Sequence, residues 1–426
     1  RCKTAREAIA LIDNLMQTYG YASSGESFTI ADPDEVWIME IMAKAPRMVE
    51  GVNVNKGAVW VAKRIPDGYI SAHANQARIT TIDFNDPDNC LYSPDVISHA
   101  REMGIFSGND KEFSFSDVYA PVDFGAARFC DARVWAFFNR YADGMDKYLD
   151  YAKGYDLSNR MPLYVKPNTK LSVKDVADMM RDHYEGTPMD MSCDIGAGGN
   201  ALPYRWRPMS FEVDGKTYLN ERAIATQQTG WWYVGQCRSD MPRDLGGLFW
   251  FGVDDAGTSA LIPIYSVSRR VPECIEKGNG SMMEYSETSL FWIVNRVTQF
   301  AYLRYNQTGA EVRSVVDKWE NEMMDKTRQL DQIAVEMYRH DPDLAREFLT
   351  DFSVNAAQTL FKKWVELDKY LMVKYIDGNT KRQESDGSFS NNGHDPRIPA
   401  SPKNEGYTQK WKEAVVKDNG KVLESK

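Results

Sequence analysis

Apolar residues recur at helical spacing along the first part of the chain. Thr4 and Glu7 have the T-x-x-E spacing of a capping box, in which each side chain bonds the backbone of the other residue. Gly20 is a natural helix stop. We therefore expect a helix between Thr4 and Gly20 with one apolar face. Five residues form this face: Ile9, Ile12, Leu15, Met16 and Tyr19.

Runs of β-branched and aromatic residues, separated by turn signals, follow this helix. They predict two hairpins, one around Ala31-Asp32-Pro33-Asp34 and one around Pro66-Asp67-Gly68. A second strand-rich block runs from about residue 207 to 270, and its clearest hairpin has Asp214-Gly215 at the turn. The expected strands cover residues 27–31, 36–41, 58–65, 69–79, 211–213, 217–219, 223–237, 247–253 and 259–266.

Helical patterns lie between and after the two strand blocks. Trp135 and Phe138 are the expected core anchors of one helix, and Asp341 with Pro342 forms the cap and first turn of another. Apolar residues at i, i+3 and i+4 mark the later helices. The expected helices cover residues 93–104, 126–147, a segment from 172, 289–305, 312–323 and 341–371.

The order of strands, helices, strands and helices favours an α+β fold over an alternating βαβ fold. We expect a main domain over residues 1–375, with a helical insert at about 93–186 and C-terminal helices at about 289–375. Apolar residues become sparse from residue 378 to 406. Residues 376–426 are therefore predicted to be an extended surface strap or a disordered tail.

Charge and cysteine usage argue against several classes of protein. The formal net charge is -10, with 51 Lys and Arg against 61 Asp and Glu, so we expect no nucleic-acid partner. No apolar run approaches the length of about 20 residues that spans a bilayer. The six cysteines contain no CxxC pair, and no two histidines have metal-ligand spacing, so we expect free thiols and no metal site. Asp254 and Asp255 are expected to be solvated turn residues.

The most unusual polar stretch is Ser71-Ala72-His73-Ala74-Asn75-Gln76-Ala77-Arg78-Ile79, late in an expected strand. In a strand His73, Asn75 and Ala77 would share one face. A buried asparagine needs a hydrogen-bond partner. Donation of the Asn75 amide to a developing oxyanion is one reason for such a residue. A bond to neighbouring backbone is the other interpretation.

A second polar stretch covers residues 220–229. Arg222 within it could orient a carboxylate or a thiolate, or form an ordinary surface ion pair. Cys237 is predicted to be a buried, inert thiol. Cys2 is a poor N-terminal nucleophile, because Arg1 precedes it and such a nucleophile needs its own free α-amine as the base.

Several strings of the sequence resemble one known family. They are GYASSGESFTIADPDEVWIMEI, GAVWVAKRIPDGYISAHANQARI, VYAPVDFGAARFCDARVW, GTPMDM and NERAIATQQTG, and the likeness extends to about Tyr375. The chain resembles the dipeptidase A-like cysteine dipeptidases of bacteria, which are related to penicillin V acylase and bile salt hydrolase.

The resemblance implies a four-layer αββα sandwich of the N-terminal-nucleophile hydrolases. It also implies a cysteine nucleophile exposed by self-cleavage, a thioester intermediate, no cofactor and short peptides as substrates. The family's nucleophile strand is expected well upstream of Thr4. We therefore expect this chain alone to lack the nucleophile, which a preceding segment or a second chain would supply, and to expose an unpaired sheet edge.

By the same resemblance, Asn75 matches the family's active-site asparagine, and Arg222 matches an arginine near the thiol. His73 and Gln76 are expected to border the substrate. Two alternatives stay open: a linear-amide acylase of the penicillin V or bile-salt type, and a non-catalytic module that binds peptides or glycans. The resemblance favours an exported protein over a cytoplasmic one, and it leaves a homo-oligomer open.

Overall fold

The computed structural model describes residues 2–425, so Arg1 and Lys426 lie outside the described part. The chain divides into two compact units, of which the first ends at Leu171 and the second begins at Ser172. Helices and strands occur in both units, as an α+β fold requires. The helical insert predicted at about residues 93–186 spans the boundary between the units.

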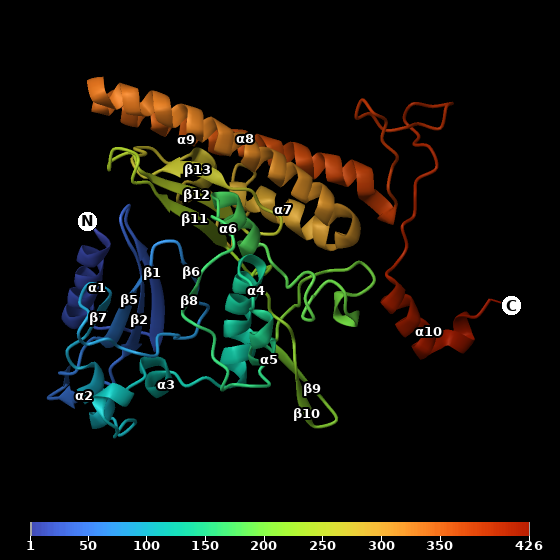
Figure 1. Ribbon diagram of the computed structural model, residues 1–426. Coiled ribbons are helices and arrows are strands. Elements are labelled where there is room, and N and C mark those ends of the chain that lie inside the picture. Colours follow the sequence, from blue (N-terminus) through green and yellow to red (C-terminus); the bar gives the residue numbers. More distant parts are fainter. Residues whose placement is uncertain (1, 426) are drawn as a thin grey trace. The chain divides into compact units, whose positions relative to one another are not determined.

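The first unit contains a four-stranded antiparallel sheet with the strand order β1-β2-β5-β7 (Figure 1). Its helices are α1 (Ala5–Tyr19), α2 (Val96–Glu102), α3 (Phe115–Tyr119), α4 (Ala132–Tyr141) and α5 (Leu149–Ala152), and a π-helix covers Ala126–Asp131. Its strands are β1 (Gly25–Ala31), β2 (Val36–Ala43), β3 (Met48–Val49), β4 (Val52–Asn53), β5 (Ala58–Ile65), β6 (Ile70–Ser71), β7 (Cys90–Tyr92) and β8 (Tyr164–Val165).

Helix α1 packs on one face of this sheet. The Thr4 side chain accepts a hydrogen bond from the Glu7 backbone N–H at 3.2 Å, so the predicted cap is confirmed. The Glu7 carboxylate itself accepts from the Lys3 N–H. The predicted apolar face is only partly right, because Leu15 and Tyr19 are exposed. Six buried residues of the sheet form the core beneath α1: Trp37, Met39, Ile41, Ala58, Trp60 and Ala62.

The other face of the sheet is buried as well. Ile38 and Val61 point to this side and pack against α2 and the residues around Phe115. This double burial explains the nearly continuous apolar run of β2, since a strand covered on both faces loses the alternation of polar and apolar residues. The two predicted anchors, Trp135 and Phe138, are buried in α4. That helix ends at Tyr141, short of the predicted residue 147.

The second unit contains a three-stranded antiparallel sheet with the order β11-β12-β13 and a separate hairpin of β9 and β10. Its strands are β9 (Ser210–Val213), β10 (Lys216–Leu219), β11 (Trp231–Cys237), β12 (Gly247–Val253) and β13 (Ile262–Tyr265). Its helices are α6 (Val173–Met180), α7 (Leu290–Tyr302), α8 (Tyr305–His340), α9 (Pro342–Tyr375) and α10 (Gln409–Leu423).

Helices α7, α8 and α9 cover one face of the three-stranded sheet, as Figure 1 shows for this unit. The Asp341 carboxylate caps α9 by accepting from the backbone N–H groups of Asp343 and Leu344, both at 3.0 Å. The strand predicted over residues 223–237 begins only at Trp231. None of the helices in residues 2–425 combines the length and the apolar character needed to cross a membrane.

The expectation that Asp254 and Asp255 are solvated is wrong, because both are buried. Asp255 accepts hydrogen bonds from the Tyr302 hydroxyl at 2.6 Å and from the Gly257 backbone N–H at 2.9 Å. Burial, together with the neighbouring charge of Asp255, raises the pKa of Asp254 to about 7. These two carboxylates belong to the core of the second unit rather than to a solvated turn.

All six cysteines are free thiols. Cys90 and Cys274 are buried, and burial raises the pKa of both, that of Cys274 to about 11. Cys237 is exposed at the end of β11, so the predicted burial of this thiol is wrong. Within residues 2–425 no group of three or more His, Cys, Asp or Glu side chains is arranged to hold a metal ion.

Candidate functional site

The segment after β6 is a loop, so the predicted strand over residues 69–79 is wrong. Strand β6 has two residues and pairs with β8, which follows much later in the chain, instead of forming a hairpin with β5. Asn75 has a φ of +61°, in the left-handed region that asparagine adopts more readily than most side chains. His73, Asn75 and Ala77 therefore do not share a strand face.

The far end of this loop is bonded to the centre of the four-stranded sheet. Glu40 is completely buried in β2, and its carboxylate accepts from the backbone N–H groups of Arg78 at 2.6 Å and Ile79 at 3.0 Å. Burial raises the pKa of Glu40 to about 7, although these two hydrogen bonds act in the opposite direction. A buried carboxylate thus fixes the backbone at the end of the polar stretch.

The Arg78 side chain fixes the start of the same loop. Its guanidinium donates to the backbone oxygen of Ala72 at 2.8 Å and to that of Pro162 at 2.7 Å. It also lies 3.5 Å from the Asp131 carboxylate, and both side chains are buried. Arg78 therefore fixes both ends of the loop, through its backbone N–H at one end and its side chain at the other. The residues between these ends are held in a defined position.

His73 contacts the first strand of the sheet. Its Nε2 lies 3.0 Å from the hydroxyl oxygen of Thr29 in β1. Burial, assisted by the positive charge of Arg78, lowers the pKa of His73. The imidazole is therefore neutral at pH 7, and it can act as one donor and one acceptor.

The Asn75 amide is bonded to an arginine from α4. Arg133 donates from Nη2 to Asn75 Oδ1 at 2.9 Å and to the backbone oxygen of Ala74 at 3.1 Å. Its Nε donates to the backbone oxygen of Phe129, in the π-helix, at 2.8 Å. The neighbouring amide of Gln76 donates from Nε2 to the backbone oxygen of Ala120 at 2.6 Å.

These side chains line one cavity of the first unit. The cavity has a volume of about 760 Å³, which is within the range of small-molecule sites. His73, Asn75 and Gln76 are therefore brought together in one cavity, and the roles that the resemblance implies for them stay predictions. The other lining residues whose side chains are polar, sulfur-containing or aromatic are Ser23, Ser24, Glu26, Ser27, Met42, Tyr119 and Arg133.

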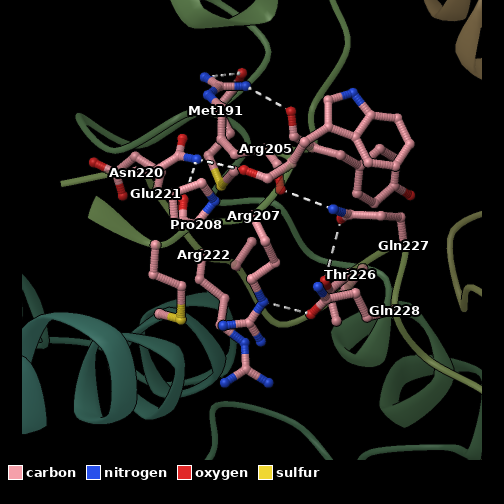
Figure 2. A pocket seen from close by; sticks show the side chains of 15 residues that line it. Met191, Arg205, Arg207, Pro208, Asn220, Glu221, Arg222, Thr226, Gln227 and Gln228 are labelled. Carbon is pink, nitrogen blue, oxygen red and sulfur yellow. Dashed lines mark hydrogen bonds between the residues drawn. The ribbon is translucent and has the colours of Figure 1, made fainter. Parts of the chain in front are cut away.

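Arg222 belongs to the second unit and lines a different pocket, shown in Figure 2. Nearby, Arg207 donates from Nε to Gln228 Oε1 at 2.9 Å, and the Arg222 backbone oxygen accepts from the Tyr184 hydroxyl at 2.9 Å. The open volume is about 20 Å³, enough for a water molecule and too small for a peptide. The role assigned to Arg222 stays a prediction.

Several residues of the first-unit site were not predicted from the sequence, among them Glu26, Glu40 and Arg133. Glu40 had a usable signal, because it is the one charge within the apolar run of β2 and a buried carboxylate needs donors. No signal in the sequence indicated Arg133, since it lies 58 positions from Asn75 in the chain. Only the folded structure brings the two together.

Comparison with known proteins gives a match to a family model. The model described as Peptidase family C69 matches residues 1–318 of this chain. The match includes all four residues predicted for the site and both strand-rich blocks. It therefore covers the cavity of the first unit and the Arg222 pocket of the second.

Individual relatives are more distant. A protein named probable dipeptidase B from Streptococcus pyogenes serotype M1 is 23% identical over 375 residues, 87% of this chain and 67% of the relative. A probable dipeptidase from Salmonella dublin is 25% identical over 65% of this chain and 54% of its own length. A probable dipeptidase from Latilactobacillus sakei is 26% identical over 74% of this chain and 58% of its own length. The chain thus spans about half to two thirds of these curated relatives.

Proposed function

Because the chain belongs to peptidase family C69, we propose that the whole protein hydrolyses short peptides, chiefly dipeptides, through a cysteine thioester. The observation that carries this proposal is the cavity of the first unit, in which His73, Asn75 and Gln76 lie side by side. Its volume of about 760 Å³ admits a short peptide. The names of the relatives, which are called dipeptidases, support the substrate class.

In the proposed reaction a cysteine thiolate attacks the peptide carbonyl, and the thiol proton passes to the free α-amine of that cysteine. The carbonyl oxygen becomes an oxyanion, to which the Asn75 amide donates a hydrogen bond. Collapse of this intermediate breaks the C–N bond, and the protonated α-amine gives its proton to the leaving amine. Water then hydrolyses the thioester, which releases the acyl part as a carboxylate and restores the thiol.

The nucleophile in this proposal is not one of the six cysteines of the chain. Cys90 and Cys274 are buried and have raised pKa values, which disfavour a thiolate. We propose that the nucleophile lies well upstream of Thr4, as the resemblance implies. A cysteine-first strand encoded upstream would support the proposal, and an upstream sequence without cysteine would refute it.

We further propose that the three-stranded sheet of the second unit is one of the two inner layers of an αββα sandwich. One face of this sheet is covered by helices. The other face carries Trp231, Tyr233 and Phe249, which are 62%, 46% and 46% exposed. The ring centroids of Tyr233 and Phe249 lie 5.1 Å apart. An aromatic face of this kind supports packing against a second sheet in the whole protein.

A comparison of substrates tests the proposed function against its alternatives. The full-length protein is incubated with an unblocked Leu- or Gly-containing dipeptide, with penicillin V and with a conjugated bile salt, before and after thiol alkylation. We expect hydrolysis of the dipeptide, abolished by alkylation. Preferred cleavage of penicillin V or the bile salt would indicate an acylase, and peptide binding without turnover would indicate a non-catalytic module.

A further inference from the structure

The hydrogen bonds of Asn75 and Gln76 fix which end of each amide is held by the protein. Arginine has donors and no acceptor, so the Asn75 atom 2.9 Å from Arg133 Nη2 must be the amide oxygen. A backbone carbonyl only accepts, so the Gln76 atom 2.6 Å from the Ala120 oxygen must be the amide nitrogen. The protein therefore holds Asn75 by its amide oxygen and Gln76 by its amide nitrogen.

The opposite end of each amide is available to a ligand. Among residues 2–425 no group accepts a hydrogen bond from the Asn75 NH₂, and none donates to the Gln76 Oε1. Both side chains line the same cavity. The cavity thus offers a donor from Asn75 and an acceptor from Gln76. A peptide group needs this pair, because it has one C=O acceptor and one N–H donor.

Arg133 is itself rigidly placed. It is half-buried, and its Nε donates to the Phe129 oxygen at 2.8 Å, inside the π-helix that precedes α4. Its Nη2 contacts both the backbone of Ala74 and the side chain of Asn75. One guanidinium therefore supports the backbone just before the left-handed Asn75 and the direction of the Asn75 amide. π-Helical turns occur frequently at functional sites.

We infer that Arg133 is a positioning residue, which holds the Asn75 amide oxygen so that the amide NH₂ faces a carbonyl oxygen of the peptide substrate. This inference rests on the proposed function. The Arg133 guanidinium does not touch the substrate in this scheme and acts only through Asn75. Gln76, held by the Ala120 oxygen, accepts a hydrogen bond from an N–H of the same substrate.

A double-mutant cycle tests this role, because residues that act through one another give non-additive losses. Initial rates of hydrolysis of an unblocked dipeptide are measured for the full-length wild type, Arg133→Met, Asn75→Ala and the double variant. We expect Arg133→Met to lower kcat by about 10- to 100-fold, since misplacement of a catalytic group is costly, with KM changed by less than about threefold. In the Asn75→Ala background the same change should alter kcat by less than about threefold.

Two further variants separate positioning from folding. Arg133→Lys keeps a charged donor and should retain more of kcat than Arg133→Met. Asn75→Asp keeps an oxygen for Arg133 but has no N–H to donate, so its kcat should be as low as that of Asn75→Ala. Arg160→Met is the matched control, because Arg160 pairs with Asp117 at 2.6 Å and does not line the cavity. Its kcat should be unchanged.

The outcomes distinguish this inference from the proposed function. A wild type that fails to hydrolyse the dipeptide refutes both. If the wild type hydrolyses the dipeptide but the kcat losses of the two single variants multiply in the double variant, the positioning role alone is refuted. The same holds if the losses appear only in KM. If Arg133→Met does not fold, Asn75→Asp decides, and activity within about threefold of the wild type would overturn the inference.

Discussion

The buried carboxylate of Glu40 accepts a hydrogen bond from the backbone N–H of Arg78 at 2.6 Å. Glu40 lies between Met39 and Ile41 in the middle of β2, where its side chain is removed from solvent. It also receives the N–H of Ile79 at 3.0 Å. A charged residue in an apolar strand thus anchors the loop that carries the candidate site.

This contact predicts a pH-dependent stability. Burial raises the pKa of Glu40 from 4.5 to about 7, so the folded chain binds this proton more tightly than the unfolded chain. The stabilisation is complete below about pH 4.5 and is lost as the pH rises through 7. At about 1.4 kcal/mol per pKa unit it amounts to ~3 kcal/mol. Glu40→Gln should remove this part of the pH dependence.

Urea unfolding of the full chain between pH 4.5 and 8 measures the effect. The exposed Glu102 provides the control, and Glu102→Gln should unfold with the same pH dependence as the wild type. A Glu40→Gln variant whose stability changes with pH in parallel with the wild type would contradict the raised pKa.

Local signals in the sequence predicted many elements correctly. The Thr4 cap, the hairpin of β1 and β2, the Asp214-Gly215 turn and the Asp341 cap are all present. Each depends on residues a few positions apart, so propensity and turn chemistry are sufficient. The clustering of His73, Asn75 and Gln76 was also within reach, because the three lie in one short segment.

Non-local contacts explain the errors. Residues 72–79 were predicted to continue a strand, yet they form a loop because β6 pairs with β8 and Glu40 accepts from the backbone N–H groups of Arg78 and Ile79. The partners involved lie tens of residues away in the chain. Asp255 is buried for a similar reason, since its Tyr302 partner is supplied by α7. No periodicity in the sequence indicates such pairings.

A buried ion pair predicts a large effect on stability in the second unit. Glu320 in α8 is fully buried and accepts from Arg181 Nη2 at 2.5 Å and from the Leu261 backbone N–H at 3.0 Å. Glu320→Ala would leave the Arg181 guanidinium buried without this partner, which costs about 3–5 kcal/mol. The free energy of unfolding in urea measures the loss.

An exposed pair on the same helix serves as the comparison. Glu322 contacts Lys326 at 2.6 Å near solvent, and Glu322→Ala should cost less than about 1 kcal/mol. If Glu320→Ala lowered the free energy of unfolding as little as Glu322→Ala does, the pair with Arg181 would not stabilise the fold.

The C-terminal segment contacts a glycine in the second unit. The Gly199 backbone oxygen accepts from the Thr408 N–H at 3.0 Å, and a Cβ at position 199 would lie 2.4 Å from the Tyr407 ring. Gly199→Ala should therefore displace the segment before α10 and speed its cleavage in limited proteolysis. Gly230→Ala, where a Cβ meets nothing within 4 Å, should leave the cleavage rate unchanged. Equal cleavage in the two variants would refute this attachment.

The most direct test of the proposed site is the turnover of an unblocked dipeptide by the full-length protein, wild type and Asn75→Asp, under the same conditions. Aspartate has the size of asparagine and can still pair with Arg133, but it offers no N–H to an oxyanion. We expect that the wild type cleaves the dipeptide and that kcat falls by about 10²- to 10³-fold in the variant, the usual effect of removing one oxyanion donor. Equal turnover by both proteins would contradict this expectation.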